Sequence, residues 1–459
     1  MLSVILPRFY LTRPITTMSS NRPALTVEQI ALQEARKLKK AKQTLAQVSE
    51  NPMAKILKRE WYRIDSPSTA HHQSVKVLTW NLLAQCLVRR ELFPTSDCLK
   101  AGQREHMIYK EVVACKADIL CLQEVDRLEK LLPILEKAGY SHRYACGPGK
   151  KHGCLIAYNR DLYEDVGEHT IYYDEQEIRS GDEEFFRRGS SFRTKNIGHL
   201  VSLKSTQGDV GLIVATTHLF WHPKYTYERA RQAGILKREV IKFRDSENHS
   251  DWPCIIAGDF NFTPDDPAYS LAVGDQLLPA QLEQLKASYV VHASIDQSLA
   301  IGIPQNEDEN EETTDSDRVI VNARPAKSSD GLLTSEELVT LFTETGPPLR
   351  SMCDVGLRLY KESLPQPPEN AARITTFGDR VPLEAHRKGA HEPQWTSYTY
   401  YWQNSIDYVF VADPSGVQST AVALLSPPNT SDLEPGIPRQ GVSGSDHVSL
   451  CTEIVFVRR

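Results

Sequence analysis

Several apolar stretches of this sequence end in polar side chains that a hydrophobic core does not need. These residues are Asn81, Glu124, His218, Asp259, Asn261, Asp407, Asp446 and His447. Taken singly, each has an ordinary explanation as a turn, loop or helix-capping residue. Their recurrence at the ends of successive apolar stretches predicts that they converge on one rim of a sheet and form a polar site there.

The two carboxylates Glu124 and Asp446 indicate the kind of metal such a site would hold. Carboxylate oxygens are hard ligands that suit Mg²⁺ or Mn²⁺ rather than zinc. A divalent ion of this kind binds a phosphate oxygen and offsets the charge that develops in the transition state. The residue types therefore favour metal-assisted hydrolysis of a phosphodiester.

The remaining polar residues suggest how water and phosphate would be handled. Asp259 and Asn261 lie two positions apart on an expected strand, so they should point to the same side and orient an attacking water. Asp407 is expected to bond one ring nitrogen of His447, which fixes its tautomer and favours its protonated form. His447 would then face the phosphate as a hydrogen-bond donor.

The segments that must position these residues alternate between strands and helices. Six short apolar runs are typical of strands: 75–80, 118–125, 154–159, 212–218, 254–259 and 406–411. Residues 227–243 predict an amphipathic helix. This mixture indicates a layered α/β fold.

Six motifs in a fixed order give these elements a family resemblance. In chain order they are LTWNLLAQ, LCLQEVD, ATTHLFWHP, IIAGDFNFTPDD, SIDYVFV and GSDHVSL. Together they resemble the endonuclease/exonuclease/phosphatase superfamily over about residues 75–455. The resemblance implies an α/β fold, a four-layer sandwich of two packed mixed β-sheets flanked by helices.

The resemblance also implies a role for each matched position. The implied catalytic residues are Asn81, His218, Asp259, Asn261, Asp407 and His447. The implied metal-side residues are Glu124, Asp446 and Asn81, holding one or two Mg²⁺ or Mn²⁺ ions. Within this pattern Glu124 is the principal metal ligand, and His218 contacts the scissile phosphate.

Accessory segments are similar to the deadenylase-type exoribonuclease branch, which includes the nocturnin, Angel and fungal Ngl types. Trp402 is expected to stack on the terminal base, with Pro223 beside His218 and with Arg193 and Lys195 on phosphates. The alternatives are a packed core ring for Trp402 and a solvated face for Arg193 and Lys195.

The expected activity is therefore a Mg²⁺-dependent 3′-to-5′ exoribonuclease that releases nucleoside 5′-monophosphates. The expected substrate is the single-stranded 3′ end of RNA, in poly(A) shortening or in ribosomal RNA trimming. One alternative keeps the site and makes the protein a phosphatase of a nucleotide cofactor or an inositol phosphate. Another is a non-catalytic scaffold that binds RNA through a basic arm.

Composition sets limits on these readings. The net charge of −6 provides no whole-protein basic footprint for nucleic acid, so polyanion binding must come from local patches or metal ions. Nine scattered cysteines without a CxxC pair argue against a zinc module or a disulfide scaffold. No apolar run approaches the roughly 20 residues of a membrane helix. We expect a monomer without a leucine-rich docking repeat.

The N-terminal region is expected to lie apart from the catalytic domain. Residues 1–25 are disordered or presequence-like, with basic residues and no acidic one before Glu28. Residues 26–60 predict a basic helical extension, which is either a solvated helix or an RNA-binding or nuclear-targeting arm. The expected location is cytoplasmic, nuclear or both, with mitochondrial import as the alternative.

The catalytic domain is expected to span residues 70–459 with an acidic insertion at about 304–330. After that insertion, SSDGLLTSEEL (328–338) resembles the second half of a calcium loop around Gly331. Its first ligand position would be Ala326, which has no side-chain oxygen. The alternative is a capped helix that begins near Thr334.

Overall fold

The computed structural model describes residues 54–64, 72–208, 210–300, 320, 322–364, 374–384 and 386–458. All of these residues belong to one compact unit of the chain. The presequence-like stretch 1–25, residues 26–53 of the expected basic extension and most of the acidic insertion lie outside them. Within the described ranges, no helix combines the length and the apolar character needed to cross a bilayer.

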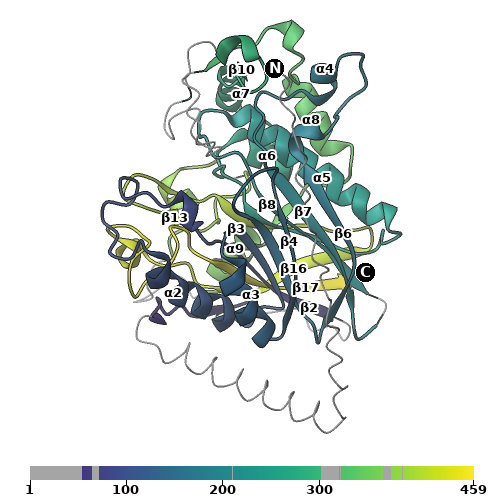
Figure 1. The fold of residues 1–459 in the computed structure, drawn as a ribbon. Coiled ribbons are helices and arrows are strands. Elements are labelled where there is room, and N and C mark those ends of the chain that lie inside the picture. The colour runs from purple at the N-terminus through teal and green to yellow at the C-terminus, as the bar shows by residue number, and fades with distance from the viewer. Residues whose placement is uncertain are drawn as a thin grey trace, which may run out of the picture. The chain divides into compact units, whose positions relative to one another are not determined.

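Two large mixed sheets organise the described residues (Figure 1). The first has seven strands in the order β1 (Trp61–Arg63), β16 (Val417–Leu425), β17 (Leu450–Arg458), β2 (His72–Asn81), β3 (Ile119–Val125), β5 (Gly153–Asn159) and β4 (Tyr140–Cys146). Strands β2 and β3 run parallel, and the other neighbours are antiparallel.

The second sheet has six strands in the order β12 (Arg350–Ser351), β15 (Asp407–Ala412), β9 (Cys254–Asp259), β8 (Gly211–His218), β7 (Ile197–Ser205) and β6 (Tyr163–Tyr172). Only its β8–β9 pair is parallel. Two short pairs complete the strands, β10 (Val290–His292) with β11 (Ala323–Pro325), and β13 (Ser397–Tyr398) with β14 (Gln403–Asn404). All six strands expected from the sequence are present.

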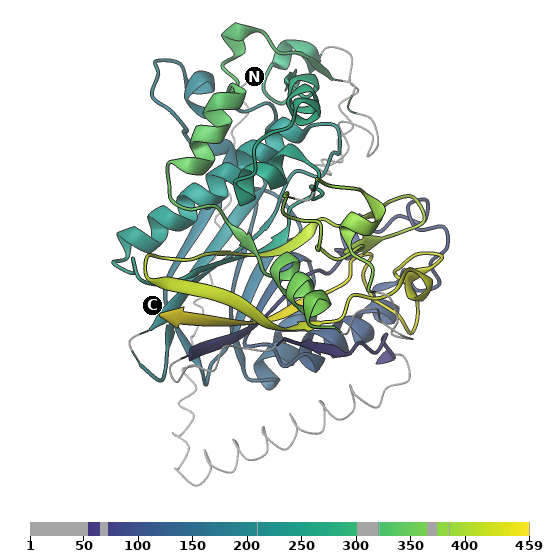
Figure 2. The ribbon, with the colours of Figure 1, turned by 180° about the vertical axis from the view of Figure 1, so that it is seen from behind.

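The helices with their bounds are α2 (Ala101–Ala114), α3 (Leu128–Lys137), α4 (Glu184–Arg188), α5 (Thr226–Ser246), α6 (Pro267–Val273), α7 (Pro279–Ala287), α8 (Ser335–Thr343), α9 (Met352–Ser363), α10 (Phe377–Arg380) and α11 (Thr430–Leu433). Short 3₁₀ turns are η2 (Gln85–Leu87), η3 (Tyr173–Glu175), η4 (Gln297–Ala300) and η5 (Ser328–Asp330). Seen from behind, the C-terminal strands β16 and β17 lie beside α9, coloured green (Figure 2).

The hydrophobic cores show why these elements stack in four layers. Strand side chains alternate between faces, so in β9 Ile255 and Ala257 face the other sheet while Cys254 and Ile256 face helices. The core between the sheets contains Val77 and Ile119 of one and Val214 of the other. Helices α2 and α3 cover the outer face of the first sheet, and α5, α6 and α8 cover that of the second. The expected four-layer sandwich is confirmed.

The expected helix at 227–243 is present as α5, but the expectation that it is amphipathic is wrong. Nearly all of its residues are buried, charged ones included, because α6, α7 and α8 pack over its outer side. The buried charges are paired within the protein: Arg231 bonds Glu228 at 2.8 Å, and Arg229 bonds Asp266 at 3.2 Å.

Two expected boundaries are corrected. Residues 54–63 belong to the folded unit and are not helical past Ala54, because β1 adds to the edge of β16 and Leu57 N–H donates to Val442 O. The acidic insertion ends earlier than residue 330, because β11 and η5 already lie within its expected span.

The segment resembling a calcium loop is the capped helix α8. The Thr334 hydroxyl accepts from Glu337 N–H, and the Glu337 carboxylate accepts from Thr334 N–H. Asp330 is held by the Arg324 guanidinium at 2.6 Å. Both carboxylates therefore have protein partners that account for them.

Candidate active site

The second sheet places three of the expected residues side by side. Asp259 ends β9, directly opposite Asp407 at the start of β15, and directly beside His218 at the end of parallel β8. His218 and Asp259 end their strands and Asp407 begins its strand, and the rest of each strand is buried. The strand register thus gathers two carboxylates and one imidazole at one rim.

The first sheet contributes Asn81 and Glu124 from the parallel strands β2 and β3. The Asn81 amide nitrogen donates to Glu124 Oε1 at 2.8 Å and to Asp259 Oδ2 at 2.9 Å. Asn81 therefore links the two sheets, although it lies 178 positions from Asp259 in the chain. This bridge makes the two strand rims a single site.

Glu124 is aimed into the site by a break in its strand. The β3–β5 register shifts between Leu122 and Val125, and Glu124 adopts φ 54°, a left-handed conformation that is uncommon outside glycine. Its second oxygen accepts from Ala84 N–H at 2.8 Å. Backbone strain at a polar residue of this kind is typical of functional sites.

The ionisation of Glu124 follows from these contacts. Burial raises the pKa of Glu124. The positive charge that His218 carries when protonated and the hydrogen bonds from Asn81 and Ala84 lower it by more, so the pKa lies below the usual value. Burial lowers the pKa of His218 to about 4, so that imidazole is neutral near pH 7. We therefore attribute the ionised state of Glu124 at neutral pH to the two hydrogen bonds.

His218 lies between two carboxylates. Its Nδ1 is 3.7 Å from Glu124 Oε1, and its Nε2 is 3.6 Å from Asp259 Oδ2. Asn196 donates its side-chain amide to His218 O at 2.7 Å, which anchors the end of β8. A ring in this position is able to touch any phosphate that reaches Glu124.

His447 forms the opposite wall of the site. Its Nδ1 is 2.8 Å from Asp407 Oδ2, and its Nε2 is 3.7 Å from Asp259 Oδ2. Burial alone would lower the pKa of His447, but the carboxylates of Asp407, Asp259 and Asp446 raise it well above its usual value. The ring is therefore a protonated donor, as the sequence led us to expect.

Asp259 is a carboxyl whose environment disfavours its charge. Burial and the nearby Asp407 carboxylate raise the pKa of Asp259 to about 8, against the opposing influence of His447 and Asn81. A buried carboxylate with a raised pKa is a stronger base than an exposed one. In its ionised form, whose share grows as the pH rises towards 8, Asp259 is suited to accept a proton from water.

Asp446 approaches from the loop that precedes β17. Burial raises its pKa to about 6, the charge of Glu124 adds to this, and His447 and Arg104 oppose it. The Ser445 hydroxyl donates to Asn81 O at 2.6 Å and so fixes this loop against β2. Glu124 and Asp446 therefore converge as two like charges.

Two converging carboxylates are the donor set expected for a hard divalent cation. The mutual repulsion of Glu124 and Asp446 is relieved when such an ion lies between them. Asn81 Oδ1 accepts from Leu83 N–H at 3.0 Å and keeps a second lone pair that is able to bind the ion. The residues fit Mg²⁺ or Mn²⁺.

A different trio, Asp259, Asp407 and His447, also has ligand atoms within 4.8 Å of one another. The Asp407–His447 hydrogen bond and the raised pKa of His447 argue against a cation there, because a protonated imidazole has no lone pair to offer. We therefore assign the expected metal to the Glu124 and Asp446 side.

Asn261 lies in the site, but by a different route from the one expected. Strand β9 ends at Asp259, and Asn261 follows it with φ 53°, so strand alternation does not position it. Its N–H donates to Asp259 Oδ1 at 3.0 Å, and its side chain donates to Leu219 O at 3.0 Å. It therefore orients Asp259 directly.

The expected substrate-binding residues are more dispersed. Trp402 is half-buried and meets Phe93 edge-on at 5.8 Å, whereas its neighbours Tyr400 and Tyr401 are 57% and 51% exposed. Pro223 is exposed on the loop after β8. Trp402 thus has both a packing role and a partly open face.

Arg193 and Lys195 are exposed on the loop that leads into β7, and Lys195 lines a pocket that reaches Glu124 and His218. The same pocket contains Lys150 and His152, which motif reasoning did not single out. A cationic wall beside the principal carboxylate is suited to a phosphate-bearing substrate.

Arg104 is the clearest functional residue that the sequence analysis missed. It is 2% exposed on α2, and it donates to the carbonyls of Leu82, Leu83 and Gly444 at 2.6, 2.5 and 2.6 Å. It therefore ties the loop after Asn81 to the loop before Asp446. No motif marks it, since an arginine in a helix normally predicts a solvated face.

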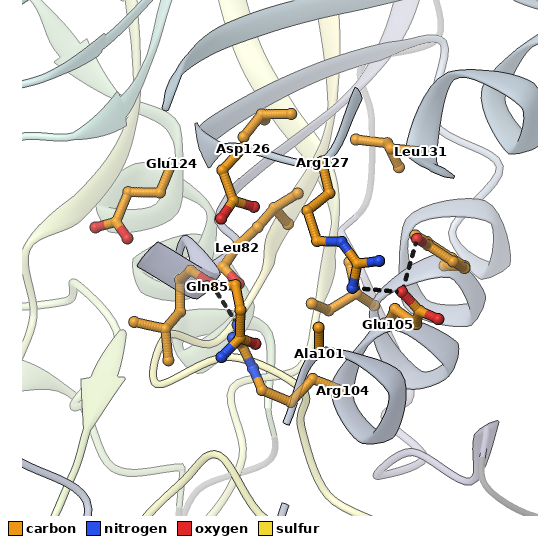
Figure 3. A pocket seen from close by; sticks show the side chains of 13 residues that line it. Leu82, Gln85, Ala101, Arg104, Glu105, Glu124, Asp126, Arg127 and Leu131 are labelled. Carbon is orange, nitrogen blue, oxygen red and sulfur yellow. Dashed lines mark hydrogen bonds and ion pairs between the residues drawn. The ribbon is translucent and has the colours of Figure 1, made fainter. Parts of the chain in front are cut away.

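A pocket behind the metal side shows this arrangement (Figure 3). Arg104 bonds Gln85 at 3.2 Å, and Arg127 pairs with Glu105 at 2.9 Å across the pocket. Glu124 and Asp126 line the same pocket, on the side away from Glu105. Arg104 thus lies within electrostatic range of the candidate metal-side carboxylates Glu124 and Asp446.

Comparison with known proteins agrees with this geometry. A family model described as "Endonuclease/Exonuclease/phosphatase family" matches residues 78–447. A probable RNA exonuclease of Schizosaccharomyces pombe is 30% identical over 94% of this chain and 88% of its own length. RNA exonuclease NGL2 of Saccharomyces cerevisiae is 31% identical over 54% of this chain and 53% of its own length.

Among solved structures, that of ANGEL2, a 2′,3′-cyclic phosphatase, matches with a TM-score of 0.56 at 20% identity. The match covers 87% of this chain and 98% of that one. At this level of identity the likeness establishes the fold alone.

Proposed function

This chain belongs to the endonuclease/exonuclease/phosphatase family, and from that membership and the site geometry we propose that it is a Mg²⁺-dependent 3′-to-5′ exoribonuclease. It would release nucleoside 5′-monophosphates from single-stranded RNA 3′ ends, in poly(A) shortening or ribosomal RNA trimming. The observation that carries the proposal is the Asn81 bridge, which unites Glu124, Asp259 and the Asp407–His447 pair around one space. Relatives named RNA exonucleases support RNA as the polymer.

The proposed reaction breaks the bond between phosphorus and the 3′ oxygen of the penultimate nucleotide. Glu124 and Asp446, with Asn81, would hold the Mg²⁺, which supplies charge stabilisation at the phosphate. Asp259 in its ionised form takes a proton from the attacking water, and Asn261 keeps that carboxylate oriented. The water oxygen becomes part of the released 5′-phosphate, and the 3′ oxygen of the shortened RNA leaves as a hydroxyl after taking a proton from solvent.

The imidazole groups of His447 and His218 would donate hydrogen bonds to the phosphate rather than activate the water. His447 donates from Nε2 to a phosphate oxygen, and Asp407 keeps that ring charged and aligned. His218 is neutral near pH 7 and donates a hydrogen bond without adding net charge. Because these donors are fixed before substrate arrives, little reorganisation is required during the reaction.

The direct test is digestion of matched RNA and DNA oligomers with free and blocked 3′ ends in Mg²⁺. The proposal expects a ladder of shortened RNA, 5′-monophosphate products, and protection by a 3′ block. Glu124→Ala should abolish the ladder. Intact RNA under these conditions, alongside release of inorganic phosphate from a nucleotide cofactor or an inositol phosphate, would instead establish the phosphatase alternative.

A further inference from the structure

An exposed aromatic and basic surface lies next to the site and is not used by the proposed chemistry. We call it the Trp221 patch, and its members are Trp221, Pro223 and Lys224 on the loop after β8, with Arg193 and Lys195 on the loop before β7. The Trp221 side chain is 44% exposed, although a large apolar ring is normally covered. Its position three residues after His218 places it close to the catalytic rim.

The two loops that form the patch are fixed to each other. Gln232 on α5 donates to the Thr194 hydroxyl at 2.9 Å and accepts from Phe220 N–H at 3.1 Å. Phe192 packs against Phe220 with ring centroids 4.8 Å apart and against Tyr225 at 4.9 Å. The cations of one loop and the indole of the other therefore share one surface.

Rings beneath the surface hold Trp221 in place. The His222 ring lies 4.9 Å from Trp221 and 4.6 Å from Tyr225, and Phe220 meets Trp221 edge-on at 6.5 Å. Arg229 on α5 donates to His222 O and to Pro223 O, which anchors the loop backbone. A supported ring loses little conformational freedom when a ligand stacks on it.

The patch is continuous with the catalytic centre through Asn196. That side chain donates to His218 O at 2.7 Å and accepts from Lys150 Nζ at 2.9 Å. Lys150, Lys195 and Asn196 line the pocket that contains Glu124 and His218. A phosphate chain that leaves the pocket on this side passes Lys150 and Lys195, and Trp221 belongs to the loop that follows His218.

We propose that the Trp221 patch is an upstream RNA subsite, in which Trp221 stacks on a nucleobase 5′ to the scissile bond and Arg193, Lys195 and Lys224 bind the phosphates leading to it. This rests on the proposed exoribonuclease function. The chain carries a net charge of −6, so a cluster of cations around an exposed ring is a local feature suited to a polyanion. Cations that follow the backbone and a ring that accepts any base form the usual combination for binding single strands.

The subsite predicts a dependence on RNA length. A dinucleotide should fill the catalytic pocket, which Lys195 lines, without reaching Trp221, whereas a 12-nucleotide single strand is long enough to reach both. Trp221→Ala should lower kcat/KM on the 12-mer by about 5- to 100-fold, mainly through KM, because stacking on one ring contributes that much. The same variant should leave kcat/KM on the dinucleotide within about 2-fold. Trp221→Phe should retain part of the advantage of the longer RNA.

The matched control is Phe185→Ala, which removes another aromatic ring that is also 44% exposed, on α4. It should not change the ratio of the two kcat/KM values. Melting temperatures of all variants identify any that are unfolded, and only ratios within one variant are compared. Lys224→Ala should weaken binding of the 12-mer and reduce its dependence on salt.

An equal loss on both RNA lengths, or no loss on either, would overturn the subsite. Failure of the exoribonuclease proposal is visible separately, because the wild-type protein would then leave both RNAs intact. Loss of the length preference in Phe185→Ala would also contradict the assignment to Trp221.

Discussion

Asp407 and Asp259 face each other across the β15–β9 pair, and both lie against the same imidazole. Asp407 is 2.8 Å from Nδ1 of His447, and Asp259 is 3.7 Å from its Nε2. The strand register thus makes one carboxylate the anchor of the ring and leaves the other beside the nitrogen that faces the site.

Asp407→Asn removes the anchoring charge without changing shape. In the proposed reaction His447 would lose its alignment and its charged form, so kcat should fall by about 10²- to 10⁴-fold, the usual range for such a proton-handling pair. Steady-state kinetics on an RNA oligomer and the ¹H–¹⁵N spectrum of the His447 ring check this. A charged ring with unchanged kcat would contradict the assignment.

Glu124→Gln separates metal binding from stability. The fold stabilises the charged form of Glu124 through donors to both of its oxygens, and an amide offers only one acceptor, so the variant should melt at a lower temperature than the wild type in EDTA. The rise in melting temperature that Mg²⁺ gives to the wild type should disappear, since ligand binding stabilises only where it occurs. Thermal melts with and without Mg²⁺ measure both effects. A retained Mg²⁺ shift would place the ion elsewhere.

Arg104→Lys tests whether Arg104 positions the metal side. A lysine ammonium cannot donate to the carbonyls of Leu82, Leu83 and Gly444 at the same time. The loops that carry Asn81 and Asp446 should therefore lose their alignment. The Mg²⁺ concentration for half-maximal activity should rise by about 10- to 100-fold, as is typical when residues supporting metal ligands are changed.

The matched control for Arg104 is Arg231→Lys, another buried arginine that donates to backbone carbonyls, those of Arg188 and Tyr173. Its hydrogen bonds go to Arg188, Tyr173 and Glu228, none of which is a candidate catalytic residue, so the variant should lower the melting temperature without changing the Mg²⁺ requirement. Equal shifts in Mg²⁺ requirement for both variants would show that Arg104 acts on stability alone.

The stability of the folded protein should depend on pH through Glu392, which is not one of the candidate site residues. Burial and the neighbouring Asp354 carboxyl raise its pKa to about 8, and Tyr269 donates to its Oε1 at 2.8 Å. The folded protein therefore keeps this proton between the usual glutamate pKa and about 8, while the unfolded chain releases it. Stability contributed by Glu392 is fully present below that window and falls as pH rises through it.

Glu392→Gln should remove this dependence while keeping the acceptor for Tyr269. The slope of unfolding free energy against pH should become less negative by up to about 1.4 kcal/mol per pH unit within the window. Urea unfolding at several pH values measures it. Parallel slopes for variant and wild type would show that Glu392 is already ionised when folded.

The sequence predicted the strands well because strong local signals coincide with burial. Residues 254–259 are apolar and end in Asp259, and the strand lies there. It misjudged α5, whose charges predict a solvent-facing side, because the cover supplied by α6, α7 and α8 is not visible in the helix itself. It misplaced Asn261 for a similar reason, since the left-handed turn after β9 is a local detail that periodicity does not encode.

The sequence by itself determined which side chains are available for chemistry, in which order, and on which strands, because residue type and short-range periodicity are local properties. The tertiary structure decided which of them meet. Asn81 joins Glu124 to Asp259, and Arg104 bonds Gly444, which lies 340 positions away, only because β-sheet packing and helix α2 bring distant segments into hydrogen-bond range. Hydrogen bonds act over about 3 Å, so contacts of this kind exist only once the layers have assembled.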